Sequence, residues 1–274
     1  MPGSVATSLH APRGIARSLG RSLVRALGFV RAALRFGAGL AVFLAYGLTI
    51  ALVGWWLGPR RLFRYSQRML RASLRAVGMR IVALGREQLG AREAYVYLFN
   101  HTSFLDHFVV TCTAPGFVVG VEKIENFKKP VYGRMVKWWG NIVVDRSDAR
   151  SGIAAIRQAR RVLKSGASVG LAPEGTRSAD GVVRAFKIGG FEIASIAQRP
   201  IVPVSLINML GCNPDGRFRL RRGTVRIVYG APIDLAACAS RDDAMARVRA
   251  AMAAAGLTVA PVVEPSGGPD EDLA

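Results

Sequence analysis

The chain has 274 residues, of which 51% are hydrophobic, and its formal net charge is +20. A chain of this length can bury one sizeable α/β core plus an accessory element, and a mean hydropathy of +0.26 is high for a soluble domain. The three cysteines show no paired or metal-ligand spacing, which excludes a disulfide scaffold and favours a reduced, cytosol-facing domain.

The positive charge is concentrated near the start of the chain. Residues 1–86 contain 14 arginines and neither a lysine nor an acidic residue, which leaves +6 for the other 188 residues. A pI of about 11.2 is also typical of nucleic-acid-binding proteins, but no nucleic-acid-reading module is recognisable. An uncharged run of 23 residues lies among the arginines. We therefore expect a membrane surface with anionic lipids as the partner, and no nucleic acid.

The uncharged run is Phe36–Gly58, which as a helix would extend about 34 Å and could cross a bilayer core. Six arginines precede it and eight follow it, and both flanks therefore favour the cytoplasmic side. A shallow hairpin that returns to the same leaflet fits this symmetry better than a simple span, and four glycines also allow a bent pair of half-helices. The run starts too late for a secretory signal peptide. We predict a basic leader and membrane-associated helical anchor over residues 1–79, at the cytoplasmic face of a cell membrane, the inner membrane in a bacterium.

Beyond the anchor, short apolar runs alternate with helical segments. The runs that predict strands are Arg80–Leu84, Tyr95–Phe99, Phe117–Val121, Asn141–Val144, Ser168–Ala172, Ile201–Ile207 and Thr224–Tyr229. The segments that predict helices are Phe104–Thr113, Ile124–Trp139 with a break at Pro130, Ala149–Ser165, and Arg241–Ala255 with Ser240 as its cap. This alternation indicates an α/β core over residues 80–256, and the Pro-, Gly- and acid-rich residues 257–274 predict a disordered acidic tail.

The segment Ile124–Trp139 carries lysines beside Trp138 and Trp139. An ordinary amphipathic helix explains this composition, and a segment at a membrane interface explains it equally well.

The first chemical motif is Asn100–Asp106, directly after the buried strand Tyr95–Phe99. Open α/β sheets build their sites at the carboxyl ends of strands, so His101 emerges where a base is useful. With Ser103 as helix N-cap, Asp106 is the third helical residue and its carboxylate can hold one imidazole nitrogen. The same spacing fits a capping box, in which Asp106 only accepts a backbone N–H.

The other histidines are poorer candidates for a base. His10 lies in the basic leader, and His107 is expected to point off another side of the helix. His101 is therefore the candidate general base.

The second motif is Pro173–Ser178, which follows the predicted strand Ser168–Ala172. Pro173 ends the strand, so Glu174 and Arg177 flank a tight Gly175–Thr176 turn. The planar fork of an arginine suits two phosphate oxygens at once, whereas a surface ion pair with Glu174 would contribute little.

Gly166–Gly170 satisfies the G-x-S-x-G pattern of serine hydrolases around Ser168. That motif requires strand, turn and helix in this order and a histidine later in the chain. Here a helical segment precedes the serine, an extended one follows, and no histidine follows His107, so we reject this alternative.

Together these motifs resemble the lysophosphatidic acid acyltransferase family, whose hallmarks are an N-H-x4-D block and a P-E-G-T-R-S block. Two further family blocks follow in order at Gly140–Arg146 and Ile201–Val204, and Phe186–Gly189 matches an F-K-x-G segment. The resemblance covers about residues 80–235. It implies an α/β fold in which helices flank a mixed sheet, with a membrane-associated helical element before it.

The resemblance also implies roles for individual residues. His101 is the general base on the acceptor hydroxyl and Asp106 orients it. Arg146 and Arg177 hold the acceptor's phosphate with help from Lys187, and Glu174 positions Arg177 or the glycerol.

We therefore expect a membrane-associated O-acyltransferase that converts 1-acylglycerol 3-phosphate to phosphatidic acid with an acyl thioester donor, either acyl-coenzyme A or acyl-carrier protein. No cofactor and no metal are expected. Another lyso-lipid acceptor, an amino-lipid or a glycolipid, and a non-catalytic lipid-binding protein remain as alternatives.

Overall fold

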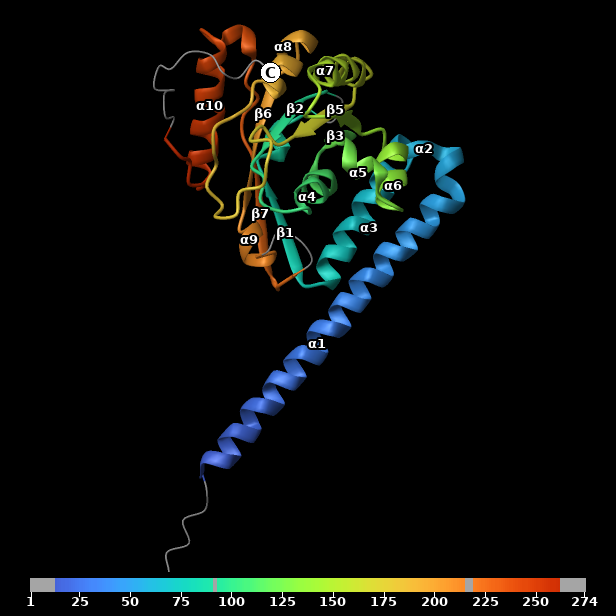
Figure 1. Ribbon diagram of the computed structural model, residues 1–274, viewed down its shortest axis with the longest axis vertical. Helices are drawn as coiled ribbons and strands as arrows, with labels where there is room; N and C mark the ends of the chain where they lie inside the picture. Colours follow the sequence, from blue (N-terminus) through green and yellow to red (C-terminus); the bar gives the residue numbers. More distant parts are fainter. Residues whose placement is uncertain (1–12, 91–92, 215–218, 262–274) are drawn as a thin grey trace, which may run out of the picture.

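The computed structural model describes residues 13–90, 93–214 and 219–261, and a seven-stranded sheet forms its centre (Figure 1). The strand order is β1-β7-β6-β2-β5-β3-β4. The strands are β1 (Met79–Leu84), β2 (Val96–Phe99), β3 (Val118–Lys123), β4 (Ile142–Val144), β5 (Ser168–Leu171), β6 (Ile201–Ile207) and β7 (Gly223–Tyr229). Only β6 and β7 pair antiparallel, so the sheet is mixed, as predicted. Each predicted strand is present, with its ends shifted by at most two residues.

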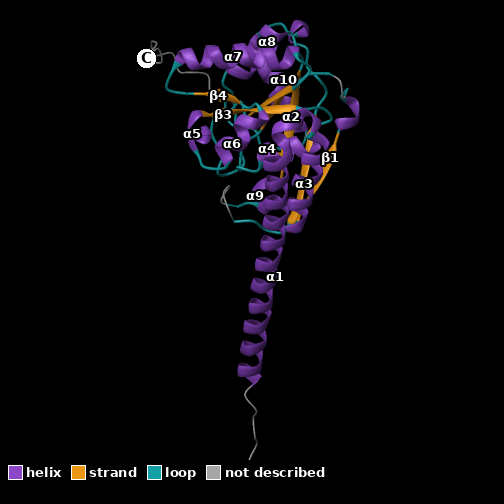
Figure 2. Cartoon of the chain, turned by 90° about the vertical axis from the view of Figure 1, so that its right-hand side faces the viewer, coloured by secondary structure: helices purple, strands orange, loops and turns teal. Residues whose placement is uncertain are grey.

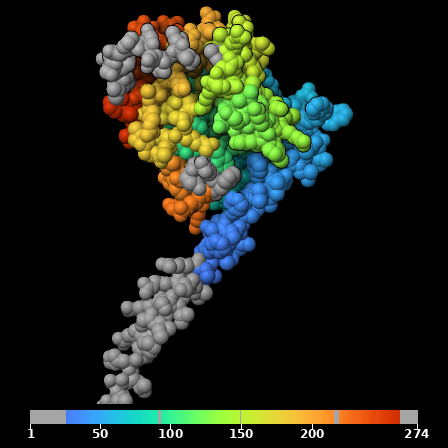
Figure 3. Space-filling view, viewed as in Figure 1, coloured from blue at the N-terminus to red at the C-terminus, as the bar shows by residue number. Residues whose placement is uncertain are grey.

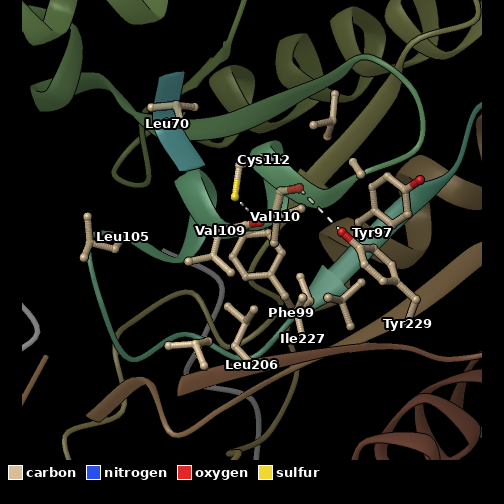
Figure 4. Packing of buried hydrophobic residues seen from close by; sticks show 14 of the residues in the cluster. Leu70, Tyr97, Phe99, Leu105, Val109, Val110, Cys112, Leu206, Ile227 and Tyr229 are labelled. Carbon is tan, nitrogen blue, oxygen red and sulfur yellow. Dashed lines mark hydrogen bonds between the residues drawn. The ribbon is translucent and has the colours of Figure 1, made fainter. Parts of the chain in front are cut away.

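Strand β2 shows why the sheet is buried on both faces. Its four residues are all buried, and successive side chains point to opposite sides. Tyr97 and Phe99 pack against helices α3 (Phe63–Ala76) and α4 (Asp106–Thr113) in the cluster of Figure 4. On the opposite face, Val96 and Leu98 belong to a second cluster.

The second face is covered by three helices, α7 (Ala149–Lys164), α8 (Gly189–Ala197) and α10 (Arg241–Ala254), which lie at the top of Figure 2. Sequence patterns do not predict α8, because it opens with two glycines and is too short and too uniformly apolar to show a helical period. Three further short α-helices are α5 (Ile124–Lys128), α6 (Tyr132–Trp139) and α9 (Met209–Cys212).

The N-terminal helices form a hairpin. Helix α1 (Arg13–Thr49) continues through a π-helical turn, η1 (Ile50–Gly54), into α2 (Trp55–Arg61). Gly58 interrupts α2 with φ 70°, and α3 then runs back beside α1 (Figures 1 and 2). The reversal lies at the end of the uncharged run. Within the run, α1 is continuous to Thr49 and is followed by the π-helical turn and α2, so the chain changes direction at Gly58 and not midway along the run.

The predicted division at residue 79 separates α3 from residues that it contacts. Phe63, Leu70 and Leu74 are buried in the core, and the Gln67 side chain donates hydrogen bonds to two carbonyls at the end of α4. The α/β domain therefore includes α3. The described part of α1 projects from this domain in the space-filling view (Figure 3).

The predicted start of the tail at residue 257 is wrong. Residues 257–260 pack against the domain, where Val259 forms a β-bridge with Val183 and the Ala260 N–H donates to the Val183 carbonyl. Residues 262–274 lie outside the described residues.

Candidate active site

The two sequence motifs meet at one edge of the sheet. Strands β2 and β5 are parallel neighbours, so the loops that follow them leave the sheet side by side. The backbone of His101 joins the loops twice. Its N–H donates to Glu174 Oε1 at 3.0 Å, and its carbonyl accepts from the Ser178 N–H at 2.7 Å. The second loop therefore holds the backbone from which the imidazole projects.

His101 and Asp106 form the pair that the sequence predicts. The distance between His101 Nδ1 and Asp106 Oδ2 is 2.7 Å. The Asp106 side chain is fully buried, whereas 18% of the His101 side chain is exposed. With Nδ1 held by a carboxylate, Nε2 is the nitrogen that can accept a proton from a substrate.

The capping function of Asp106 is also present. Asp106 Oδ2 accepts from the Thr102 and Ser103 N–H groups, each at 2.8 Å. The structure places Asp106 first in α4, so the predicted third helical position is wrong. Ser103 still caps the start of this helix, because its Oγ accepts from the Leu105 N–H at 3.0 Å. The same carboxylate oxygen caps the loop and orients the base, and the two alternatives are therefore compatible.

Two residues of the first motif, Asn100 and Ser103, hold this loop in place through partners that the sequence did not single out. Asn100 Oδ1 accepts from the Leu206 N–H at 2.7 Å, and Asn100 Nδ2 donates to the Leu206 carbonyl at 3.1 Å. Ser103 Oγ donates to Asn213 Oδ1 at 2.6 Å. Both partners are more than 100 residues away, so no local pattern signals them.

Glu174 is buried and binds backbone. Its Oε1 accepts from the His101 N–H, and its Oε2 accepts from the Arg184 N–H at 3.0 Å. Burial raises the pKa of this carboxyl group, while the two N–H bonds oppose that shift. These two hydrogen bonds of Glu174 hold the geometry of the loops, and its predicted role of positioning Arg177 or the glycerol stays a prediction.

The candidate phosphate-binding cations surround the Gly175–Thr176 turn. Gly175 has φ +73°, a conformation that favours glycine, and a Cβ atom there would lie 3.0 Å from Lys187 Cε. The Lys187 N–H donates to the Pro173 carbonyl, which ties this lysine to the same turn. The side chains of Arg177 and Lys187 are both exposed.

Arg146 follows β4, at the same edge of the sheet and also exposed. Strand β4 is three positions from β2, and at about 4.8 Å for each pairing this corresponds to about 14 Å. Arg177 follows β5, which is next to β2. Arg177 is thus the arginine closer to the base.

A mostly apolar pocket of about 50 Å³ lies beside His107. Tyr46 and Leu70 of the N-terminal hairpin line one part of it, and His107, Glu122 and Tyr132 line another. The ring centroid of His107 is 6.4 Å from that of His101, and burial lowers the pKa of His107. Tyr132 Oη donates to Glu122 Oε1 at 2.7 Å.

The serine hydrolase alternative fails in the structure as well. Ser168 is buried at the start of β5, and its Oγ accepts from the Tyr95 N–H at 3.1 Å. No strand–turn–helix elbow surrounds it. Within the described part of the chain, no group of His, Cys, Asp and Glu side chains could hold a metal ion.

The chain is similar to known acyltransferases. The family model described as Acyltransferase matches residues 80–207. The chain is 35% identical over 151 residues to a 1-acyl-sn-glycerol-3-phosphate acyltransferase of Chlamydomonas reinhardtii, covering 54% of this chain and 45% of that protein. It is 33% identical over 151 residues to the enzyme of the same name from Borreliella burgdorferi, covering 53% and 60%. The chain spans about half the length of the first of these relatives.

A solved structure has the same fold. The crystal structure of the 1-acyl-sn-glycerophosphate acyltransferase from Thermotoga maritima superimposes with a TM-score of 0.71 at 21% identity, covering 84% of this chain and 95% of that one.

Proposed function

We propose that this chain is a member of the lysophosphatidic acid acyltransferase family and transfers a fatty acyl chain from a thioester to the free hydroxyl of a lysophospholipid. The proposed reaction makes phosphatidic acid from 1-acylglycerol 3-phosphate. The observation that carries the proposal is the bond between His101 Nδ1 and buried Asp106, held beside the arginine-containing turn. A protein that only binds lipid would have no need of an oriented base.

In the proposed reaction, His101 Nε2 removes the proton from the acceptor hydroxyl as its oxygen bonds to the thioester carbonyl carbon. The tetrahedral intermediate then collapses, the C–S bond breaks, and the imidazolium returns the proton to the departing thiolate. Asp106 stabilises the imidazolium between these steps. No acyl-enzyme is required, and Ser103, which is buried and bonded to Asn213, is not available as a nucleophile.

The acceptor's phosphate is proposed to bind Arg177, with Lys187 and Arg146 supplying further positive charge. A phosphomonoester carries nearly two negative charges at neutral pH, and the guanidinium fork matches two of its oxygens. Acyl-coenzyme A or acyl-carrier protein would serve as donor, without a metal or a further cofactor.

The hairpin is proposed to attach the enzyme to the cytoplasmic face of a membrane. The helix over Ala26–Arg61 is long and apolar enough to cross a membrane, and only 11% of its most apolar window is buried. Leu44, Leu48 and Leu52 repeat every four residues and are each more than 60% exposed, so they form an apolar stripe that water does not favour. Because the chain reverses after Gly58, a hairpin inserted into one leaflet fits this surface.

A lyso-lipid with an amine in its headgroup is a second candidate acceptor. Glu122 is a buried carboxylate that lines the pocket beside His107, where it would attract an ammonium group and repel a phosphate.

The test is a thiol-release assay on purified protein, with coenzyme A and acyl-carrier protein thioesters as donors. Acceptors would be 1-acylglycerol 3-phosphate, 1-acylglycerol and a lyso-amino-lipid, with His101→Ala as the inactive control. We expect thiol release that depends on 1-acylglycerol 3-phosphate. A preference for an acceptor without a phosphate would contradict the assignment.

A further inference from the structure

The turn between α5 and α6, residues 128–134, presents an apolar side chain to solvent. Val131 is 77% exposed, and its backbone has φ 60° and ψ −61°. A β-branched residue rarely adopts a positive φ, and the Tyr132 N–H closes the turn on the Pro130 carbonyl at 2.6 Å. The fold therefore holds a valine outward in a conformation that valine does not favour.

The surrounding contacts make this turn rigid. Tyr132 Oη donates to buried Glu122, Lys129 Nζ donates to Asn126 Oδ1 at 2.7 Å, and the Gly133 N–H donates to the Lys129 carbonyl. Tyr132 is thus bonded to β3 and Lys129 is held within the turn, and the exposed position of the valine follows from these neighbours.

The turn is also basic. Four exposed cations surround Val131, namely Lys128, Lys129, Arg134 and Lys137. The exposed acid on the two helices is Glu125. An apolar tip within a cluster of cations matches the interface of a bilayer that contains anionic lipids.

The turn is continuous with the hairpin. Trp138 Nε1 donates to the Gly54 carbonyl at 3.1 Å, and a Cβ atom on Gly54 would lie 3.0 Å from the Trp138 ring. Helix α6 therefore packs closely on the corner of the hairpin, where Trp55 and Trp56 are 86% and 82% exposed. Figures 1 and 3 show α5 and α6 beside this corner.

We propose that the α5–α6 turn is a second membrane contact, in which Val131 enters the interfacial region and the surrounding lysines and arginine bind anionic lipid headgroups. This proposal rests on the proposed attachment of the hairpin. Tyr132 and Val136 line the pocket beside His107, and Tyr46 and Leu70 of the hairpin line it as well. The two membrane contacts therefore place both walls of this pocket at the bilayer surface.

The test uses a fluorescent label on the full-length chain. A Cys238→Ser background leaves Cys112 and Cys212, which are both fully buried. Val131→Cys would carry an environment-sensitive nitrobenzoxadiazole label, and Ile153→Cys on α7 would be the matched control, because Ile153 is also apolar, 53% exposed and on the helix layer of the opposite face. Both proteins would be mixed with phosphatidylcholine vesicles that contain or lack about one-third phosphatidylglycerol.

We expect the label at residue 131 to brighten, shift to the blue and be quenched by spin-labelled lipids, while the label at residue 153 stays unchanged. Lys128→Glu with Lys129→Glu should weaken the response of residue 131 on anionic vesicles by about tenfold and leave acylation of detergent-dispersed substrate unchanged.

Three outcomes would overturn the proposal in different ways. If the chain sediments with vesicles but residue 131 gives no response, the hairpin attaches the enzyme and the turn does not. If residue 131 responds equally on neutral and anionic vesicles, the headgroup contacts are wrong. If the chain does not sediment at all, the hairpin attachment itself is wrong, and the second contact fails with it.

Discussion

The base and the phosphate-binding side of the site are built in opposite ways. Asp106 is fully buried and accepts three hydrogen bonds, one of them from His101. Arg177 and Lys187, by contrast, have exposed side chains on a turn that is fixed through its backbone and through Glu174. Proton transfer requires a base within hydrogen-bond reach of the substrate, whereas long, flexible cationic side chains can bind a charged headgroup. The rigid side should therefore control turnover, and the exposed side should control acceptor binding.

The largest expected effect is at the base. His101→Ala should lower turnover by about 10²- to 10⁴-fold, the contribution of general base catalysis, because no other described group is bonded to Asp106 in the same way. The fold should persist, since the imidazole is partly exposed and its backbone carries the bonds to the second loop. Thiol release and circular dichroism measure the two effects. Near-normal turnover would remove His101 from the mechanism.

Asp106→Asn should come next, with a loss of about 10²-fold in turnover and a melting temperature close to that of the wild type. The asparagine oxygen can still accept the Thr102 and Ser103 N–H groups, but it lacks the charge that stabilises imidazolium. Steady-state kinetics and thermal unfolding on the same preparation separate catalysis from capping. A fully active Asp106→Asn variant would show that Asp106 only caps the loop and does not assist the base.

Arg177→Ala should raise the KM for 1-acylglycerol 3-phosphate by about ten- to a hundredfold and leave the KM for the donor nearly unchanged, because hydrogen bonds to charged groups contribute about 1.5–3 kcal/mol. Arg146→Ala should have a smaller effect, since β4 is farther from β2 than β5 is. Arg177→Lys should restore binding only in part. Lys164→Ala, an exposed cation at the end of α7, is the control. Equal changes in the KM for donor and acceptor would show that Arg177 has a structural role and does not bind the phosphate.

Glu174→Gln should have the smallest effect on activity and should lower the free energy of unfolding by about 1–3 kcal/mol, because an amide can accept only one of the two backbone N–H bonds well. Urea unfolding measures this change. An unchanged midpoint would show that the loop is held by its other bonds.

The difference in stability between the wild type and Glu174→Gln should also depend on pH. Burial raises the pKa of Glu174 above its ordinary 4.5, so the folded state binds this proton more tightly than the unfolded state does. The stability that comes from protonation is complete below the ordinary pKa and is lost as the pH rises through the raised one. The wild type should therefore gain stability relative to Glu174→Gln as the pH is lowered through this window. A difference that does not vary with pH would contradict the raised pKa.

The parts of the site that the sequence can predict are those set by local spacing and by the order of the strands. His101 and Asp106 are five residues apart, so local spacing is enough to place them together. The strands are found from their apolar runs, and parallel order brings the two motif loops to one edge. Partners distant in sequence leave no such pattern: Asn100 binds Leu206, and Glu174 binds the His101 N–H.

Helix α3 is a further example. Its arginine-rich sequence continues the basic flank of the anchor, but buried residues such as Leu70 and Gln67 join it to the core. A truncation at residue 75 would therefore expose the sheet as well as remove the hairpin.

The most direct test of the division between base and phosphate-binding side compares two acceptors that differ only in the phosphate. The kcat/KM values for 1-acylglycerol 3-phosphate and 1-acylglycerol would be measured for the wild type, Arg177→Ala and His101→Ala. We predict that the wild type prefers the phosphorylated acceptor, that Arg177→Ala loses most of this preference while keeping its rate with 1-acylglycerol, and that His101→Ala slows both acceptors by the same factor. If Arg177→Ala lowered kcat/KM equally for both acceptors, the turn after β5 would not recognise the phosphate. The proposed division between a base that controls turnover and an exposed side that controls acceptor binding would then be wrong.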